Sequence, residues 1–213
     1  MWSQAVVDVV NRNFAEVNLV SSDVSKYLAS GFFWHTPDTA HLHVTDSMIW
    51  WEHHYKIFEH AITNVTNLSG TCVQQILTQI RQEFLDPSSW TVFPEVTCCL
   101  SELSSIGWKH IILSNHVPEL SDLIENLGLL NSFETIVTSA EIGYEKPNRM
   151  AFDWVTRSLP GNSKIWMIGD NYSADVLGAN NVKLGAILVR NKNEHAEHFA
   201  ETLNEVRCIL ELN

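Results

Sequence analysis

Features that mark several large classes of protein are missing from this sequence of 213 residues. No apolar run reaches the roughly 18 residues that a membrane-spanning helix needs, and the chain does not open on the basic residues and apolar core of a secretory signal. Positive charge is also scarce, because 13 lysines and arginines stand against 25 acidic residues, for a formal net charge of -12. Proteins bind nucleic acids by placing Lys and Arg on the phosphates. The sequence therefore predicts neither a nucleic-acid nor a membrane partner.

The four cysteines are spaced too irregularly to form a zinc site or a disulfide framework. Cys98 and Cys99 are adjacent, whereas Cys72 and Cys208 lie far from them and from each other. We therefore expect free thiols and a cytoplasmic location. The hydrophobic content of 45% is ordinary for a globular protein with a sizeable core, and nothing in the sequence indicates an oligomeric state.

What is present changes in character partway along the chain. Apolar residues recur at helical spacing through residues 1–88, including the stretches 23–33 and 46–62. Prolines and polar turn residues then interrupt the pattern at 86–94. Beyond them, short β-branched runs alternate with helical segments. We expect a helical bundle over 1–88 and an α/β domain over 89–213.

The second part of the sequence predicts a Rossmann-like parallel sheet with helices on both faces. The apolar runs expected as strands are 109–114, 133–138, 164–169 and 185–189. The helices between and after them are expected to begin at Pro118, Pro147, Ser173 and Glu194. Such sheets bind ligands beyond the carboxyl ends of their strands, so the residues that follow each strand are the candidates for a site.

Residues that suit an anionic ligand follow the first two predicted strands. Ser114 and Asn115 end the first, before a helix whose free N–H groups can bind an anionic oxygen, and we predict both as substrate-binding. Lys146 precedes Pro147 after the second, where a fixed cation can neutralise phosphate charge. Ser114 and Asn115 could instead only cap a helix, and Lys146 could be one more solvated lysine.

Two carboxylates follow the third predicted strand. Asp170 ends this strand, and Asp175 lies near the start of the next helix. Their mutual repulsion is best relieved by a hard divalent cation, and Mg²⁺ prefers one or two carboxylates together with waters and a phosphate. The carboxylates could instead only cap the helix at Ser173. Because all these groups follow successive strands of one predicted sheet, we favour a Mg²⁺ site for phosphoryl transfer.

These residues, in this order, resemble the second, third and fourth motifs of the haloacid-dehalogenase-like hydrolase superfamily. The match lies in Ser114, in Lys146, and in Gly169 and Asp170 with Asp175. It extends over residues 90–190, and the helical first part is similar to the family's α-helical cap. The segment GDNYSAD resembles the phosphatase form of the fourth motif rather than the dehalogenase form, which has no metal.

The resemblance implies roles for these side chains. Asp170 would ligate Mg²⁺, and Asp175 would support the metal directly or through water. Ser114 and Lys146 would hold the transferring phosphoryl group, so that Ser114, Lys146 and Asp170 are the predicted catalytic residues. The implied substrate is a small phosphorylated metabolite, hydrolysed through an aspartyl-phosphate.

The family's first motif, an Asp-x-Asp-x-Thr sequence that supplies the attacking carboxylate, has no counterpart here. The early acidic residues Asp8, Glu16 and Asp23 follow no apolar strand and have no acidic partner two positions on. In this fold the first strand is expected at the centre of the sheet, between the strands at 109–114 and 164–169. We therefore expect a truncated, inactive chain with this central strand missing.

Two other functions remain open on the same fold. A non-catalytic module could keep Mg²⁺ and phosphate binding and use its cap to engage a partner, and pyrophosphate or phosphonate chemistry is a third possibility. The aromatic residues Phe32, Phe33, Trp34, Trp50 and Trp51 could line a substrate pocket, although core packing is the more common role of such clusters.

Overall fold

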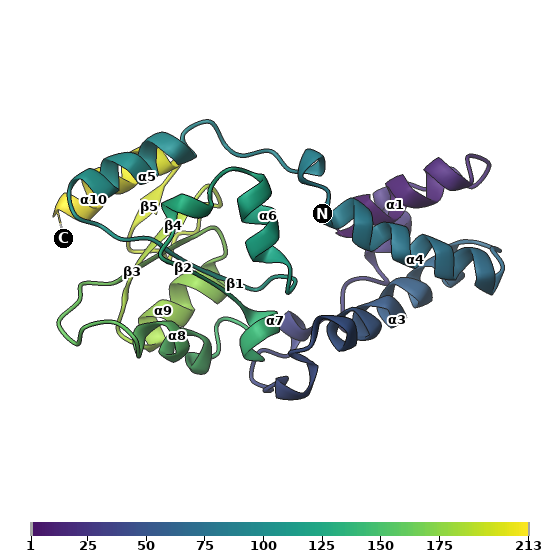
Figure 1. Ribbon diagram of the computed structural model, residues 1–213, viewed down its shortest axis with the longest axis horizontal. Helices are drawn as coiled ribbons and strands as arrows, with labels where there is room; N and C mark the ends of the chain where they lie inside the picture. Colours follow the sequence, from purple (N-terminus) through teal and green to yellow (C-terminus); the bar gives the residue numbers. More distant parts are fainter. Residues whose placement is uncertain (1, 213) are drawn as a thin grey trace. The chain divides into compact units, whose positions relative to one another are not determined.

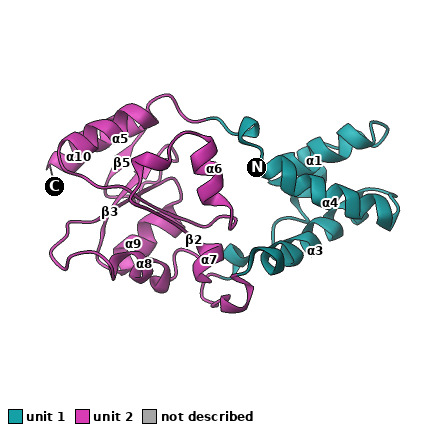
Figure 2. Ribbon diagram, in the orientation of Figure 1, with its two compact units in different colours: residues 1–36, 46–91 teal, residues 37–45, 92–213 magenta. Residues whose placement is uncertain are grey.

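The computed structural model describes residues 2–212 and divides the chain into two compact units (Figure 2). One unit comprises Met1–Thr36 and Asp46–Thr91, and the other comprises Pro37–Thr45 and Val92–Asn213. The predicted change at residues 88 and 89 lies close to the boundary between Thr91 and Val92. No pattern in the sequence predicts that Pro37–Thr45 belongs to the second unit.

The first unit is helical (Figure 1). Its helices are α1 (Trp2–Asn13), α2 (Ser21–Ser25), α3 (Ser47–Val65) and α4 (Gly70–Leu85), with the short 3-10 helices η1 (Phe33–His35) and η3 (Pro87–Ser89). Asp46 caps α3, because its carboxylate accepts hydrogen bonds from the backbone N–H groups of Met48 and Ile49. The helical pattern expected over residues 23–33 is wrong for most of its length, since α2 ends at Ser25 and a turn region follows.

Aromatic side chains form the core of this helical unit. Trp50 and Trp51 are each 1% exposed, and Phe32 and Phe33 are also buried. The ring of Trp2 stacks on that of Phe84 with 3.8 Å between centroids, which joins α1 to α4. Core packing therefore accounts for these aromatic residues, as their burial would contribute strongly to folding.

The second unit is α/β, as predicted, with parallel strands (Figure 1). Strand β1 (Ile111–Ser114) pairs with β2 (Thr135–Thr138), and β3 (Trp166–Gly169), β4 (Gly185–Val189) and β5 (Phe199–Ala200) pair in that order. The helices are α5 (Val96–Ser105), α6 (Leu120–Asn126), α7 (Ser139–Ile142), α8 (Arg149–Thr156), α9 (Gly178–Asn181) and α10 (Val206–Leu212). A π-helical segment, η5 (Tyr172–Leu177), precedes α9, and the 3-10 helices are η2 (Leu42–Val44), η4 (Leu130–Ser132) and η6 (Leu203–Glu205).

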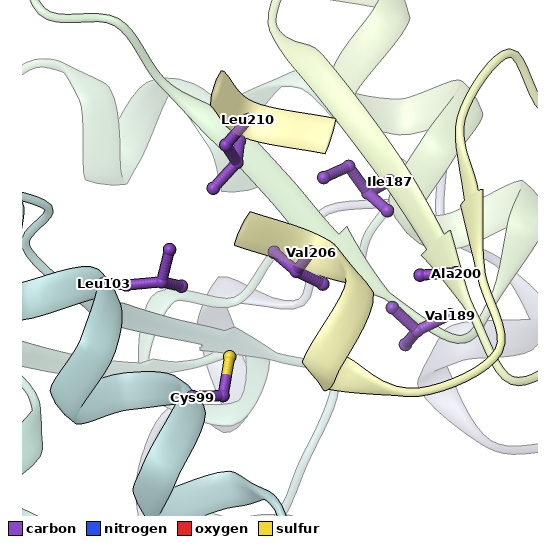
Figure 3. Packing of buried hydrophobic residues seen from close by; sticks show 7 residues of the cluster. All are labelled: Cys99, Leu103, Ile187, Val189, Ala200, Val206 and Leu210. Atoms are coloured by element: carbon purple, nitrogen blue, oxygen red, sulfur yellow. The ribbon is translucent and has the colours of Figure 1, made fainter. Parts of the chain in front are cut away.

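Alternation along β4 creates two apolar layers, one on each face of the sheet. Ile187 and Val189 pack with residues of α5 and α10, and Figure 3 shows Cys99 and Leu103 of α5 in this cluster. The alternate residues of β4, Ala186 and Leu188, belong to a second cluster with α8, η5 and α9. This second cluster consists of Phe152, Val176, Ala179, Ala186 and Leu188.

One predicted element of this unit is wrong. No helix begins at Glu194; a strand, β5, follows instead and pairs with the end of β4 through Val189 and Ala200. The stretch from Glu194 to β5 has no apolar stripe on which a helix could pack, and its glutamates Glu194 and Glu197 are exposed. Ala200 is completely buried, so packing at the sheet edge determines the structure here.

The inner edges of the two sheets differ from the rest of the fold. Among the described residues, β1 has no hydrogen-bonded neighbour except β2, and β3 has none except β4. Strand β4, which is paired on both sides, has four buried residues, whereas every residue of β1 and β3 is only half-buried. Leu113 of β1 and Met167 of β3 nevertheless pack on one apolar cluster. Strands β1 and β3 therefore contribute to one apolar cluster, and each has one edge with no hydrogen-bonded strand among the described residues.

Candidate functional site

The end of β1 is tied to the turn that carries Lys146. Both polar atoms of the Asn115 side chain bind the Lys146 backbone: Nδ2 donates to its carbonyl oxygen (2.9 Å), and Oδ1 accepts from its N–H (2.7 Å). The prediction that Asn115 binds substrate is not tested by this contact. The contact does give Asn115 a positioning role, since it sets where the backbone of Lys146 lies. Ser114 is half-buried at the strand end, in register with Thr138 of β2.

Lys146 forms a buried ion pair with Asp175. Its Nζ lies 2.6 Å from Oδ1 of Asp175, and the two side chains are only 8% and 6% exposed. Breaking such a pair by removing one partner is costly, because the remaining charge stays buried without compensation. The structure thus brings together two residues that the sequence places 29 positions apart.

The strand end at Gly169 is shaped to receive Asp175. The second carboxylate oxygen of Asp175 accepts a hydrogen bond from the N–H of Asn171 at 3.0 Å. A Cβ atom at Gly169 would lie 2.2 Å from that oxygen, so only glycine fits against the carboxylate. The Asn171 side chain accepts from the N–H of Ala174 and caps η5, a π-helical turn of the kind that often occurs at functional sites.

Asp170 differs from Asp175 in its exposure. Its side chain is exposed just beyond β3, and its backbone carbonyl accepts from the Asn191 side chain at 3.0 Å. Each oxygen of Asp175 already accepts one hydrogen bond inside the fold, whereas the carboxylate of Asp170 is exposed and open to direct ligation. Mg²⁺ prefers one or two carboxylates together with waters and a phosphate. Asp170 as a direct ligand, with Asp175 nearby, fits this coordination. Among residues 2–212, no three His, Cys, Asp or Glu side chains form a metal-binding group on their own.

Three strand ends therefore meet at Lys146. Asn115 after β1 binds its backbone, the turn after β2 and α7 carries it, and its side chain reaches Asp175 beside the end of β3. This arrangement can bind an anion at a fixed ammonium group and a cation at an exposed carboxylate.

A segment of the first half of the sequence also reaches this turn. The N–H of His41 donates to the carbonyl of Gly143 (2.7 Å), and the Asn148 side chain donates to that of Pro37 (2.8 Å). Gly143 has a positive φ of 72°, and a Cβ atom at this position would lie 3.0 Å from the backbone of Leu42. These contacts explain why Pro37–Thr45 belongs to the second unit.

Glu145 is a site residue that the sequence analysis missed. It is 3% exposed, and its Oε2 has no hydrogen-bond partner. Burial raises its pKa to about 7, against the opposing effects of a hydrogen bond from Ser139 and the charge of Lys146. A glutamate in a polar loop is normally exposed, so nothing local in the sequence indicates this burial.

Other findings on the described residues bear on the remaining expectations. The four cysteines are free thiols, and Cys99 is buried while Cys98 is exposed. No helix in the described part of the chain combines the length and apolar character needed to cross a membrane.

Comparison with known proteins identifies relatives by sequence. The chain is 35% identical over 109 residues to a glyceraldehyde 3-phosphate phosphatase of Methanothermobacter thermautotrophicus, a match that covers 49% of this chain and 47% of the relative. It is 30% identical over 118 residues to haloacid dehalogenase-like hydrolase domain-containing protein 3 of Bos taurus, covering 55% and 47%. The chain thus spans about half the length of the curated relatives it matches.

Solved structures share the fold at lower identity. A magnesium-bound hydrolase from Bacillus subtilis superposes with a TM-score of 0.72 at 17% identity, covering 99% of this chain and 92% of that one. A phosphatase from Thermococcus onnurineus gives 0.62 at 22% identity, covering 98% and 87%. The model of the haloacid dehalogenase-like hydrolase family matches residues 4–183. The chain therefore belongs to the haloacid dehalogenase-like hydrolase family.

Proposed function

We propose that this chain forms the main part of a Mg²⁺-dependent phosphatase that acts on small phosphorylated metabolites in the cytoplasm. The observation that carries the proposal is the buried pair of Lys146 and Asp175 beside the exposed Asp170. It combines an anion-binding ammonium group with a carboxylate free to ligate a metal. Relatives named as phosphatases of glyceraldehyde 3-phosphate and of ribulose 1,5-bisphosphate support a phosphorylated substrate of this size.

In this proposal each residue of the chain has a distinct task. Lys146 neutralises the phosphoryl oxygens, and Ser114 donates a hydrogen bond to one of them. Asp170 ligates Mg²⁺ and Asp175 supports it through water, since its own oxygens are engaged by Lys146 and Asn171. Bound Mg²⁺ would supply charge neutralisation of the phosphoryl group. Asn115 keeps Lys146 in place through its backbone.

The attacking carboxylate is proposed to come from a strand that pairs between β1 and β3. Both strands have an open edge, are only half-buried, and contribute to one apolar cluster. A parallel strand inserted there would satisfy backbone groups on both sides, and its carboxyl end would lie beside Lys146. Its first carboxylate would form a bond to phosphorus while the P–O ester bond breaks, and the second aspartic acid of the Asp-x-Asp sequence would give its proton to the departing oxygen. Water, losing a proton to that second carboxylate, would then attack the aspartyl-phosphate, release phosphate and restore the first carboxylate.

The test compares this chain with one that carries an added apolar strand ending in Asp-x-Asp-x-Thr. Turnover of p-nitrophenyl phosphate is measured with Mg²⁺ and with EDTA. We expect no turnover by the chain as it stands and Mg²⁺-dependent turnover by the extended chain. In the extended chain, Asp170→Ala and Lys146→Met should each lower kcat/KM at least about 100-fold, the range seen when one charge-stabilising group is removed. The exposed Asp122→Ala is the matched control and should leave turnover unchanged.

Two outcomes would contradict the phosphatase proposal. Turnover that survives Asp170→Ala would place the metal elsewhere. A well-folded extended chain with no turnover would favour the non-catalytic binding module.

A further inference from the structure

Glu145 is a buried acid that the proposed chemistry leaves unused. It directly precedes Lys146, is 3% exposed, and has one carboxyl oxygen without a hydrogen-bond partner. Buried carboxyl groups of this kind are rare, because desolvation penalises their charged form. A role in the site is the first explanation to consider for one that adjoins the central cation.

Glu145 is linked to the loop after β1, which also contains Asn115. The Ser139 hydroxyl donates to the Glu145 carboxyl group and accepts from the N–H of His116 at 3.3 Å. His116 belongs to the loop after β1, next to Asn115, which itself binds the backbone of Lys146. Two connections therefore join the loop after β1 to the turn before α8. One acts on the backbone of Lys146, and the other ends on the residue beside it.

The charge that acts on Glu145 is that of Lys146, whose Nζ pairs with Asp175 at 2.6 Å. The backbone N–H of His116 binds the same Ser139 hydroxyl. Desolvation lowers the pKa of the half-buried His116 imidazole to about 4, so the ring is neutral near pH 7. Ionisation of Glu145 would therefore place a second carboxylate beside Lys146, in competition with any bound anion.

We infer that Glu145 is a positioning residue for Lys146, and that its ionisation weakens the hold of Lys146 on an anion. The inference deepens the proposed function, since it rests on Lys146 as the anion-binding group. While Glu145 is neutral, Lys146 is shared only between Asp175 and the ligand. Once Glu145 is charged, it attracts the ammonium group and lowers the positive potential at the site.

The primary test follows the side-chain ammonium signal of Lys146 by ¹⁵N NMR from about pH 5.5 to 8.5. The signal is assigned by its loss in Lys146→Met. We expect it to shift through neutral pH in the wild-type chain, and not in Glu145→Gln, which keeps the shape of the side chain without its ionisation. Glu125→Gln, at an exposed glutamate of α6, is the matched control and should shift like the wild type. An equal shift in Glu145→Gln, or no shift in the wild type, would overturn the inference.

The second test measures binding of inorganic sulfate, which stays a dianion over this range. Affinity should be roughly fivefold higher at pH 6 than at pH 8, a change of the order expected for one nearby charge. Glu145→Gln should remove most of this difference, and Ser139→Ala should move its midpoint upward, because Ser139 stabilises the charged form. Absence of sulfate binding in every variant would count against the proposed anion site. The Lys146 signal would still decide the role of Glu145.

Discussion

Gly169 is the residue whose small size allows Asp175 to lie against the end of β3. A Cβ atom there would lie 2.2 Å from the Asp175 carboxylate, which cannot move freely because Lys146 and Asn171 hold both of its oxygens. We expect Gly169→Ala to lower the free energy of unfolding by about 1–3 kcal/mol, the usual cost of overpacking. Urea unfolding measures it, with Gly161→Ala as control, since nothing lies within 4 Å of a Cβ at Gly161. Equal effects of the two changes would refute this explanation.

The pKa of Glu145 predicts a pH dependence of stability. It is raised by burial from about 4.5 to about 7, so between these values the folded chain binds a proton that the unfolded chain has lost. The stabilisation that this group contributes is fully present below pH 4.5 and is lost as the pH rises to 7. The free energy of unfolding should fall by about 3 kcal/mol over this range. Glu145→Gln should flatten this part of the profile in urea unfolding, whereas Glu125→Gln should not. An unchanged slope in Glu145→Gln would show that the carboxyl group is ionised when folded.

At the scale of elements, Asn115 joins the loop after β1 to the turn before α8 by its two hydrogen bonds to Lys146. Asn115→Ala would leave both backbone groups of Lys146 without these partners. We expect a loss of about 1–3 kcal/mol in the free energy of unfolding for each group that stays buried and unpaired. Asn115→Asp keeps the acceptor and should recover part of the loss, as followed by thermal unfolding. An alanine variant as stable as the wild type would mean that water replaces the side chain.

At the scale of the whole molecule, metal binding should stabilise the α/β unit. A ligand that binds only the folded state at tenfold above its Kd adds about 1.4 kcal/mol. We expect Mg²⁺ to raise the melting temperature over that in EDTA, and Asp170→Asn to abolish the rise. Asp122→Asn, at an exposed carboxylate of α6, serves as the control. A rise that persists in Asp170→Asn would locate the cation away from the end of β3.

Much of the fold and of the site could be predicted from local patterns. Apolar, β-branched runs predict four of the strands, and β4 matches its expected range of 185–189. The polar residues after those strands are candidates for a site because parallel strands end at one edge of a sheet. Local patterns do not predict a short segment whose structure depends on packing against other elements, such as the two-residue strand β5. The helix expected to begin at Glu194 was wrong for this reason.

Short-range periodicity and the positions where strands end are enough to predict the parallel α/β architecture and to identify Ser114, Lys146 and Asp170 as candidates. The partners of these residues come from the tertiary structure. The contact of Asn115 with Lys146 joins positions 31 apart, and that of Lys146 with Asp175 joins positions 29 apart. The burial of Glu145 likewise depends on packing around it. No local pattern encodes such contacts, since they arise only when separate strands are brought to one edge.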